Sequence, residues 1–249
     1  KIFSDMGGNP VKTHVTKGVE AYKAGGCDSV IAVGGGAPID VAKVVALMVH
    51  HPGDLYDYED GNPDAPPVDQ HIPLLVAVPT TAGTGSEVGR SSVISEDGTG
   101  IKRIIFSPRL MPAKVFADPE LTLGLPAKIT AATGLDALTH LLEAYLAKGY
   151  HPMCDGIALE GIQMVHDSLK QCVDFAMLDE DELDIEGEMG LEAHAKARSQ
   201  MLLAALMGAV AFQKGLGVNH SCAHALSTVC DMHHGLANAM MLPFCMDFN

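Results

Sequence analysis

The order of strand and helix patterns constrains the fold of this chain more than any other feature. In the first half, short β-branched runs alternate with helical patterns, starting with a strand at 29–33 and a helix at 40–50. Further strands are predicted at 74–78, 92–95, 103–106 and 114–117, the middle two paired around an Asp-Gly turn. Such alternation predicts a parallel or mixed β-sheet covered by helices.

The second half has a different pattern. From Leu121 onward the strand signals vanish, and apolar residues recur with the 3.6-residue period of helices. The acidic segment 179–188 is interpreted as a solvated loop and the start of a helix. Helices are predicted at 131–147, 155–175 and 191–212, and from about 219 onward. We therefore predict an α/β domain over residues 1–120 and an all-helical domain over residues 121–249.

Composition argues against several partners and compartments. The net charge of −15, from 16 basic and 31 acidic residues, disfavours non-specific binding to nucleic acid or to an anionic membrane. A phosphate-bearing cofactor remains possible, because backbone N–H groups at a helix start bind phosphate. The six cysteines form no CxxC pair, and the longest apolar run, 201–212, is too short to span a membrane. We expect a reducing, cytoplasmic location; the start at Lys1, with no signal-peptide pattern, is interpreted as that of a fragment.

Two loops are candidates for binding a nucleotide. Residues 30–43 read VIAVGGGAPIDVAK, an apolar strand followed by three glycines and a helix start, which suits an anionic pyrophosphate. The pattern is not GxGxxG, and a tight turn without a ligand explains it equally well. Residues 79–88 read PTTAGTGSEV and follow a second strand, where α/β sheets bind ligands. The alternative is a Ser/Thr-rich helix cap, but two such loops after neighbouring strands favour a nucleotide.

Four of the twelve histidines lie within residues 219–235, NHSCAHALSTVCDMHHG. His220 and His224 share one face of a predicted helix, and Asp136 and His140 have the same spacing on an apolar helix upstream. A buried Asp needs a cation or several donors, although an isolated Asp-x-x-x-His pair is usually a surface hydrogen bond. One carboxylate and three imidazoles from three segments suit a divalent first-row metal such as Fe²⁺ or Zn²⁺.

Taken together, these stretches resemble the iron-dependent (group III) alcohol dehydrogenases. The matching segments are GGGAPIDVAK, PTTAGTGSEV, ATGLDALTH, and GLGVNHSCAHAL followed by HHGLANAMMLP. They occur in the family's order and span nearly the whole chain. The resemblance implies an N-terminal dinucleotide-binding α/β domain and an all-helical C-terminal metal-binding domain, with the metal in the cleft between them.

The resemblance also implies roles for individual residues. His224 matches a histidine near the metal that is not a ligand, and it is the candidate catalytic proton carrier. His233 is expected to be exposed to solvent. The implied metal ligands are Asp136, His140, His220 and His234. The implied cofactor-binding residues are Asn9, Gly35, Gly36, Ala37, Asp40, Thr80, Thr81, Thr84, Val93 and Lys102.

The chain departs from the family pattern at several positions. Ala37, Gly89 and Ala225 stand where Ser, Thr and Pro are commoner. The family's first strand and its acidic ribose-reading residue would precede Lys1, and its last helices would follow Asn249. The choice between NAD and NADP is therefore open.

The activity implied is hydride transfer between a small alcohol or aldehyde and NAD(P) in a metal-dependent homo-oligomer. The resemblance favours iron, whereas the general affinity order favours Zn²⁺ over Fe²⁺. Two alternatives stay open. One is a zinc glycerol dehydrogenase or dehydroquinate-synthase-like enzyme of the same architecture, and the other is a non-catalytic assembly subunit that keeps the fold.

Overall fold

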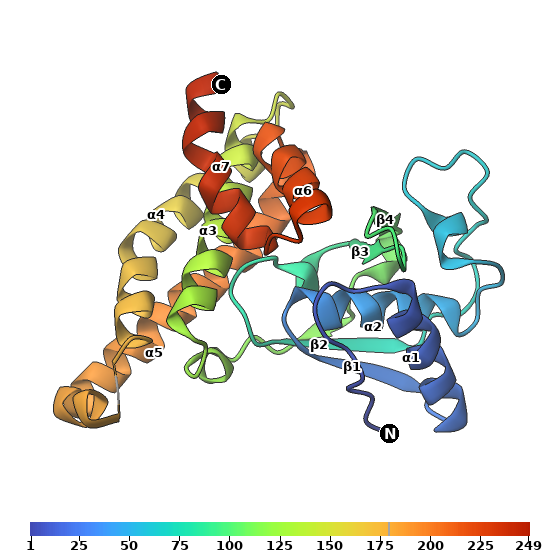
Figure 1. Ribbon diagram of the computed structural model, residues 1–249, viewed down its shortest axis with the longest axis horizontal. Helices are drawn as coiled ribbons and strands as arrows, with labels where there is room; N and C mark the ends of the chain where they lie inside the picture. Colours follow the sequence, from blue (N-terminus) through green and yellow to red (C-terminus); the bar gives the residue numbers. More distant parts are fainter. Residues whose placement is uncertain (179) are drawn as a thin grey trace. The chain divides into compact units, whose positions relative to one another are not determined.

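A computed structural model of the chain describes residues 1–178 and 180–249 (Figure 1). The chain divides into two compact units. The first comprises Lys1–Pro79 and Ser86–Phe116, and the second comprises Thr80–Gly85 and Ala117–Asn249. Every strand formed by the described residues belongs to the first unit, and the long helices α3 to α7 belong to the second. The predicted fold class, an α/β half followed by an all-helical half, is confirmed.

The first unit is built on a parallel sheet of three strands in the order β1-β2-β5. β1 and β2 pair in register from their first residues to Gly34 and Pro79. Successive side chains of a strand point to opposite faces, so Ala32 of β1 packs against helix α2 whereas Ile31 is 67% exposed. The strands are β1 (Ser29–Gly34), β2 (Leu74–Pro79) and β5 (Lys114–Val115), and α2 spans Gly36–Met48.

Helix α1 (Lys12–Ala24) packs on α2, and an antiparallel hairpin forms a separate two-stranded sheet. The hairpin strands are β3 (Ser91–Ser95) and β4 (Lys102–Phe106), as the sequence predicts. The strands therefore form two sheets instead of the one that the sequence predicts. Outside the hairpin, Ser95 and Ile105 form only isolated bridges, with Val11 and Glu59, and the apolar side chains of the hairpin pack on α2. The core of this unit includes Val15, Val44, Leu47, Ile94, Ile105 and Leu110.

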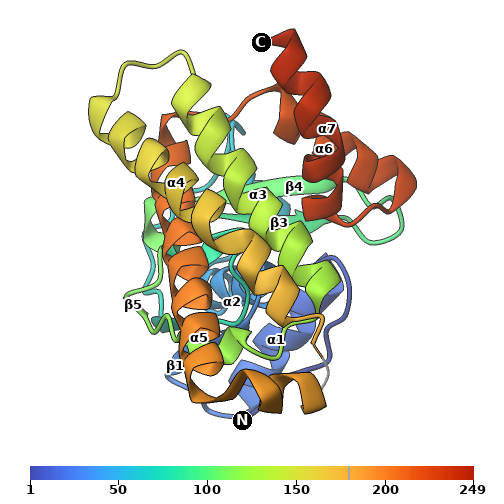
Figure 2. The same cartoon turned by 90° about the vertical axis from the view of Figure 1, so that its left-hand side faces the viewer.

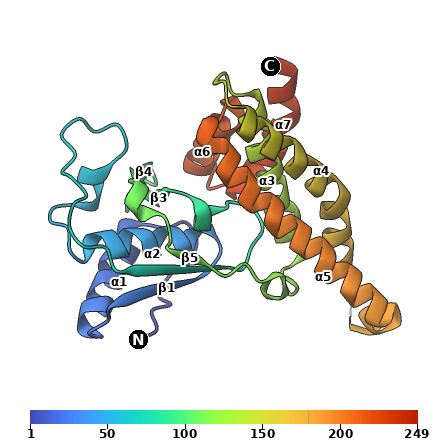
Figure 3. The same ribbon diagram turned by 180° about the vertical axis from the view of Figure 1, so that it is seen from behind.

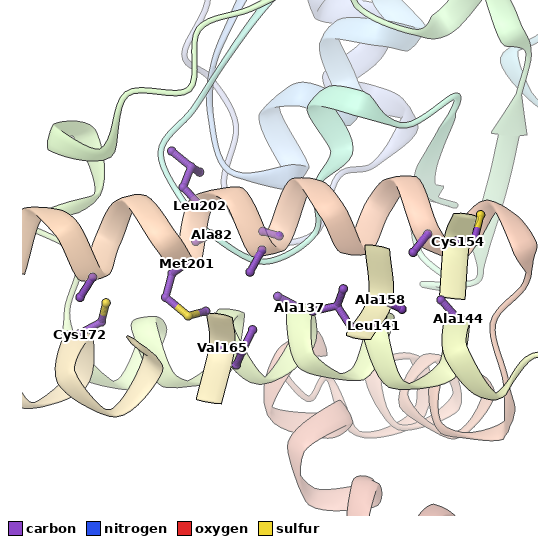
Figure 4. Packing of buried hydrophobic residues seen from close by; sticks show 14 residues of the cluster. Ala82, Ala137, Leu141, Ala144, Cys154, Ala158, Val165, Cys172, Met201 and Leu202 are labelled. Carbon is purple, nitrogen blue, oxygen red and sulfur yellow. The ribbon is translucent and has the colours of Figure 1, made fainter. Parts of the chain in front are cut away.

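The second unit is a bundle of helices. Figures 2 and 3 show α3, α4 and α5 lying alongside one another. Their core is made of small and medium-sized side chains, including Ala137 and Leu141 of α3, Val165 of α4 and Met201 of α5 (Figure 4). Small side chains let helices approach closely, which keeps polar residues on α3 out of water. The helices are α3 (Ala127–Leu146), α4 (Pro152–Phe175), α5 (Glu180–Ala211), α6 (Val218–Cys230) and α7 (His234–Phe248).

The acidic segment 179–188 is more helical than the sequence suggests. Asp179 lies outside the described residues, but α5 already begins at Glu180. The glutamates of this segment favour helix, and Gly187 interrupts it with a left-handed backbone (φ +64°).

None of the described helices is, by itself, long and apolar enough to cross a membrane. The pair Gly187–Lys214 and Val218–Cys230, bent by 108°, meets that requirement together by length and composition alone.

Candidate metal centre

Three helices of the second unit bring the four predicted metal ligands together. Asp136 and His140 lie one turn apart on α3, on a helix whose neighbouring side chains fill the core. His220 is in the first turn of α6, and His234 is the first residue of α7. Asp136, His140 and His220 are buried, with 2–5% of their surface exposed, whereas His234 is half-buried.

The donor atoms of these side chains converge. One donor atom each from Asp136, His140 and His220 lies within 4.8 Å of the other two. His220 Nε2 and His234 Nε2 are 3.7 Å and 3.6 Å from Asp136 Oδ1, which is longer than a good hydrogen bond. Two ligands of a tetrahedral ion with bonds of about 2.1 Å are roughly 3.4 Å apart. The donors of Asp136, His140 and His220 suit a divalent ion such as Fe²⁺ or Zn²⁺, and His234, which lies beside Asp136, would supply a third nitrogen.

The electrostatics of the cluster favour an ionised carboxylate. Burial alone would raise the pKa of Asp136, but the imidazoles of His140, His220 and His234 outweigh this and lower it. Burial lowers the pKa of His140, which favours the neutral ring that a metal requires. Burial would also lower the pKa of His220, but the nearby carboxylates of Asp136 and Glu143 raise it. The cluster is therefore a buried anion surrounded by imidazoles.

Two residues that the sequence analysis missed complete the cluster. Glu143 of α3 accepts a hydrogen bond from His220 Nδ1 at 2.5 Å. Asn238 of α7 donates from Nδ2 to Asp136 Oδ1 at 2.6 Å, and its Nδ2 lies 3.3 Å from both His220 Nε2 and His234 Nε2. Helical spacing was the available signal, since Glu143 follows His140 by three residues and Asn238 follows His234 by four.

The remaining histidines of the segment separate into two environments. His224 is half-buried on α6, and its ring centroid is 5.2 Å from that of His234 and 6.5 Å from that of His220. His233 is exposed, as predicted. His224 therefore lies at the edge of the cluster, whereas the side chain of His233, which precedes His234, is exposed to solvent.

The glycine turn connects β1 to α2 in the first unit. Gly34 has φ +147°, and a Cβ added there would lie 2.7 Å from the Pro38 ring, so no other residue fits. Gly35 is the N-cap of α2 and has no side chain to cap the helix, while Gly36 and Ala37 form its first turn. The N–H groups at this helix start are suited to an anion.

Asp40, assigned by resemblance to the cofactor loop, turns inward. Its Oδ1 accepts a hydrogen bond from Ser86 Oγ at 2.5 Å, and its Oδ2 accepts one from the Val93 backbone N–H at 2.9 Å. Lys43 is fully buried, lies 4.0 Å from Asp40, and donates to Ser86 Oγ and to the Ser91 carbonyl. Burial raises the pKa of Asp40 and lowers that of Lys43. The structure thus brings Asp40 and Val93 together through a buried polar network.

The other predicted cofactor residues belong to other segments of the chain. Asn9 is exposed, next to Pro10, whose carbonyl accepts a hydrogen bond from the Ser95 N–H. Lys102 is half-buried on β4, paired with Ser95. Thr80, Thr81 and Thr84 are half-buried in the loop Thr80–Gly85, which belongs to the second unit.

The threonine loop packs closely against helices of the second unit. Gly85 has φ +60°, and a Cβ added there would overlap Ala209 of α5. A Cβ added to Gly83 would lie 2.8 Å from the Thr133 side chain of α3. Both glycines are required for the loop to approach these helices.

Comparison with known proteins agrees with these features. The family model described as iron-containing alcohol dehydrogenase matches residues 1–119, and the one described as Fe-containing alcohol dehydrogenase family, C-terminal, matches residues 130–249. A 4-hydroxybutyrate dehydrogenase from Cupriavidus necator is 39% identical, covering 100% of this chain and 62% of that relative.

Two solved structures extend the comparison. A 1,3-propanediol oxidoreductase superposes with a TM-score of 0.87 at 36% identity, covering 100% of this chain and 60% of that one. A sulfoacetaldehyde reductase from Bifidobacterium kashiwanohense, solved in complex with NAD⁺, superposes with a TM-score of 0.85 at 32% identity, covering 100% and 61%. The chain thus spans about three fifths of the length of these relatives. On the match of both halves, the chain belongs to the iron-containing alcohol dehydrogenase family.

Proposed function

We propose that this chain carries the site of a metal-dependent oxidoreductase that transfers a hydride between a small alcohol or aldehyde and NAD(P). One observation carries the proposal: the buried Asp136 carboxylate lies 3.6 Å and 3.7 Å from the Nε2 atoms of His234 and His220, in a cluster with His140. Family membership supports the reaction class, and the NAD⁺ complex of a relative supports the nicotinamide cofactor.

Four side chains would hold the ion: Asp136, His140, His220 and His234. Asp136 would provide the negative charge, and the three imidazoles would provide nitrogen donors. An ion held there supplies a Lewis acid toward the alcohol oxygen, and a bound nicotinamide supplies the acceptor or donor of the hydride. Because three of the four ligands are buried, little water reaches the donor atoms, and electrostatic interactions among them are strong.

The two loops that follow β1 and β2 would hold the dinucleotide. The N–H groups of Gly35, Gly36 and Ala37 would bind a phosphate at the start of α2. The hydroxyl groups of Thr80, Thr81 and Thr84 would bind phosphate or ribose, and Asn9, Val93 and Lys102 would contact the rest of the cofactor. Asp40 would act through its hydrogen bonds to Ser86 and Val93, which fix the helix that carries the glycine turn.

His224 would carry the proton that leaves the alcohol. It lies one turn from His220 on α6 and is half-buried, so its ring borders the cluster and still reaches solvent. Imidazole is the side chain best suited to move a proton near neutral pH.

Several finer features belong to the same proposal. Family membership favours iron over zinc, since the donor set alone suits both ions. We expect a homo-oligomer in a reducing, cytoplasmic compartment, which agrees with six cysteines that are all free thiols. The relatives' names indicate short alcohols, diols or hydroxy acids as the substrate class.

The test measures the metal content of anaerobically purified protein. It then measures turnover of NAD(P)(H) with short alcohols and aldehydes, before and after the metal is removed by a chelator. We expect about one Fe or Zn per chain and turnover that depends on it. His234→Ala is expected to lose metal, whereas His233→Ala, a change at the exposed neighbouring histidine, is expected to keep it. Turnover that survives complete removal of metal would contradict the proposal.

A further inference from the structure

Glu143 connects two of the helices that form the candidate metal centre. It lies on α3, one turn beyond His140, and is 4% exposed. Its Oε2 accepts a hydrogen bond from His220 Nδ1 at 2.5 Å, across 77 residues of sequence. The opposite ring nitrogen, His220 Nε2, is the atom that faces Asp136. The imidazole of His220 is therefore held between two carboxylates, one at each nitrogen.

Glu143 also binds the backbone at the start of α6. Its Oε1 accepts from the Asn219 N–H at 2.7 Å, and its Oε2 accepts from the His220 N–H at 3.3 Å. Gly217, the N-cap of α6, has no side chain to satisfy these N–H groups. A Cβ added to Gly217 would lie 2.6 Å from Glu143 Oε1, so glycine is needed for the carboxylate to reach the helix. Glu143 thus fixes both the helix and the ring of His220.

We infer that Glu143 is a positioning residue that holds His220 in the orientation and tautomer in which Nε2 is the metal-binding atom. This inference rests on the metal site of the proposed function. A carboxylate at Nδ1 accepts only from Nδ1–H, which leaves the lone pair on Nε2 for the ion. It also makes the ring a stronger electron donor, as in the carboxylate–histidine–metal triads of other metalloproteins.

If Glu143 only capped α6, its substitution would have a different effect than if it also positioned His220. Capping the Asn219 N–H needs only one oxygen, which a glutamine at position 143 also supplies. The glutamine would then present its NH₂ group to His220 Nδ1. A donor at that place favours the tautomer with its proton on Nε2, which has no lone pair for a metal. Glu143→Gln therefore separates the two roles.

The experiment titrates the metal-free full chain with Co²⁺ against a competing chelator, following the visible absorption of bound Co²⁺. We expect Glu143→Gln to weaken Co²⁺ binding by about 10- to 100-fold and to alter the absorption bands. The matched control is Asp155→Asn, which makes the same carboxylate-to-amide change in the same unit, at a carboxylate that accepts from Lys214 Nζ. Its Co²⁺ affinity is expected to equal that of the unmodified chain.

A second variant keeps the inference testable if Glu143→Gln folds poorly, as thermal melting of the metal-free proteins would show. Gly217→Ala keeps the Glu143 carboxylate, but the added Cβ pushes it away from α6. This variant is also expected to weaken Co²⁺ binding. Unchanged Co²⁺ affinity in folded Glu143→Gln, or an equal loss in Asp155→Asn, would overturn the inference and leave the proposed function intact. An unmodified chain that binds no Co²⁺ would overturn the proposed function, and this inference with it.

Discussion

Gly235 lies so close to the backbone of Ala132 that a Cβ added to it would overlap the Ala132 carbonyl oxygen. Ala132 is on α3, one turn before Asp136, and Gly235 directly follows His234 at the start of α7. The contact therefore fixes the distance between α3 and the start of α7. It sets how closely His234 approaches Asp136, since the two side chains leave the helices next to this contact.

Gly235→Ala is expected to separate the two helices. We expect a loss of about 1–3 kcal/mol in the free energy of unfolding, as for other overpacked sites, and weaker metal binding through displacement of His234. Urea denaturation and Co²⁺ titration measure the two effects. Gly156→Ala is the matched control, because Gly156 is exposed within α4 and an added Cβ meets nothing within 4 Å. The free energy of unfolding of that control should rise by about 0.5–1 kcal/mol. Equal changes in unfolding free energy and in Co²⁺ affinity in the two variants would contradict the role of the contact.

Asp40→Asn is expected to destabilise the first unit. The carboxylate accepts from Ser86 and Val93 and is one of two buried carboxylates, with Glu87, that act on the fully buried Lys43, so the amide removes part of the counter-charge of a buried cation. Breaking a buried pair in this way costs about 3–5 kcal/mol. Chemical denaturation measures the stability of the variant, and NAD(H) titration measures whether it still binds the dinucleotide. Asp5→Asn, at an exposed ion pair with Lys17, serves as the control and should leave both unchanged.

His224→Ala is expected to lower turnover while leaving bound metal nearly unchanged. The ring lies beside the cluster, 5.2 Å from the His234 ring centroid, but it follows ligand His220 by a full turn. Loss of a proton carrier typically lowers the rate about 10²- to 10⁴-fold. Steady-state kinetics and metal analysis of the same sample check the prediction. If the variant lost its metal, His224 would be a ligand and not a proton carrier.

Local patterns account for what the sequence predicts correctly. The strands at 29–34 and 74–79 and the four-residue spacing of Asp136 and His140 are features of neighbouring residues, so periodicity alone identifies them. The first turn of α6, which carries His220, is local in the same way. The assignment of these residues to metal binding needed the family resemblance, because spacing alone also fits a surface pair.

Long-range contacts account for what the sequence analysis missed. Glu143 meets His220 across 77 residues, and Asn238 meets Asp136 across 102. Their helical spacing from His140 and His234 was visible, but a Glu or Asn on a helix is ordinarily solvated. Only the packing of three helices turns these side chains inward. The inward turn of Asp40 has the same origin, since its partner Val93 lies 53 residues away.

A second buried histidine lies outside the metal centre. His194 and Arg198 are both buried on α5, and Arg198 Nε donates to His194 Nε2 at 3.0 Å. Arg198 also donates to Thr130 Oγ1 at 2.9 Å, and the Phe175 ring stacks on His194. Burial, with a smaller contribution from the Arg198 charge, lowers the pKa of His194 from 6.5 to about 4. In the folded chain His194 is therefore neutral at pH 7, with Nε2 as an acceptor.

This arrangement predicts a dependence of stability on pH. Because the folded pKa of about 4 is below the unfolded value of 6.5, the unfolded chain binds one more proton between these values. The stability is fully present above pH 6.5 and falls as the pH drops toward 4, by up to about 1.4 kcal/mol per pH unit. His194→Gln keeps an acceptor for Arg198 and does not titrate, so it should remove this part of the slope. Urea denaturation of both proteins at pH 7.5 and pH 5 measures the difference, and equal losses in the two would show that folding does not lower the pKa of His194.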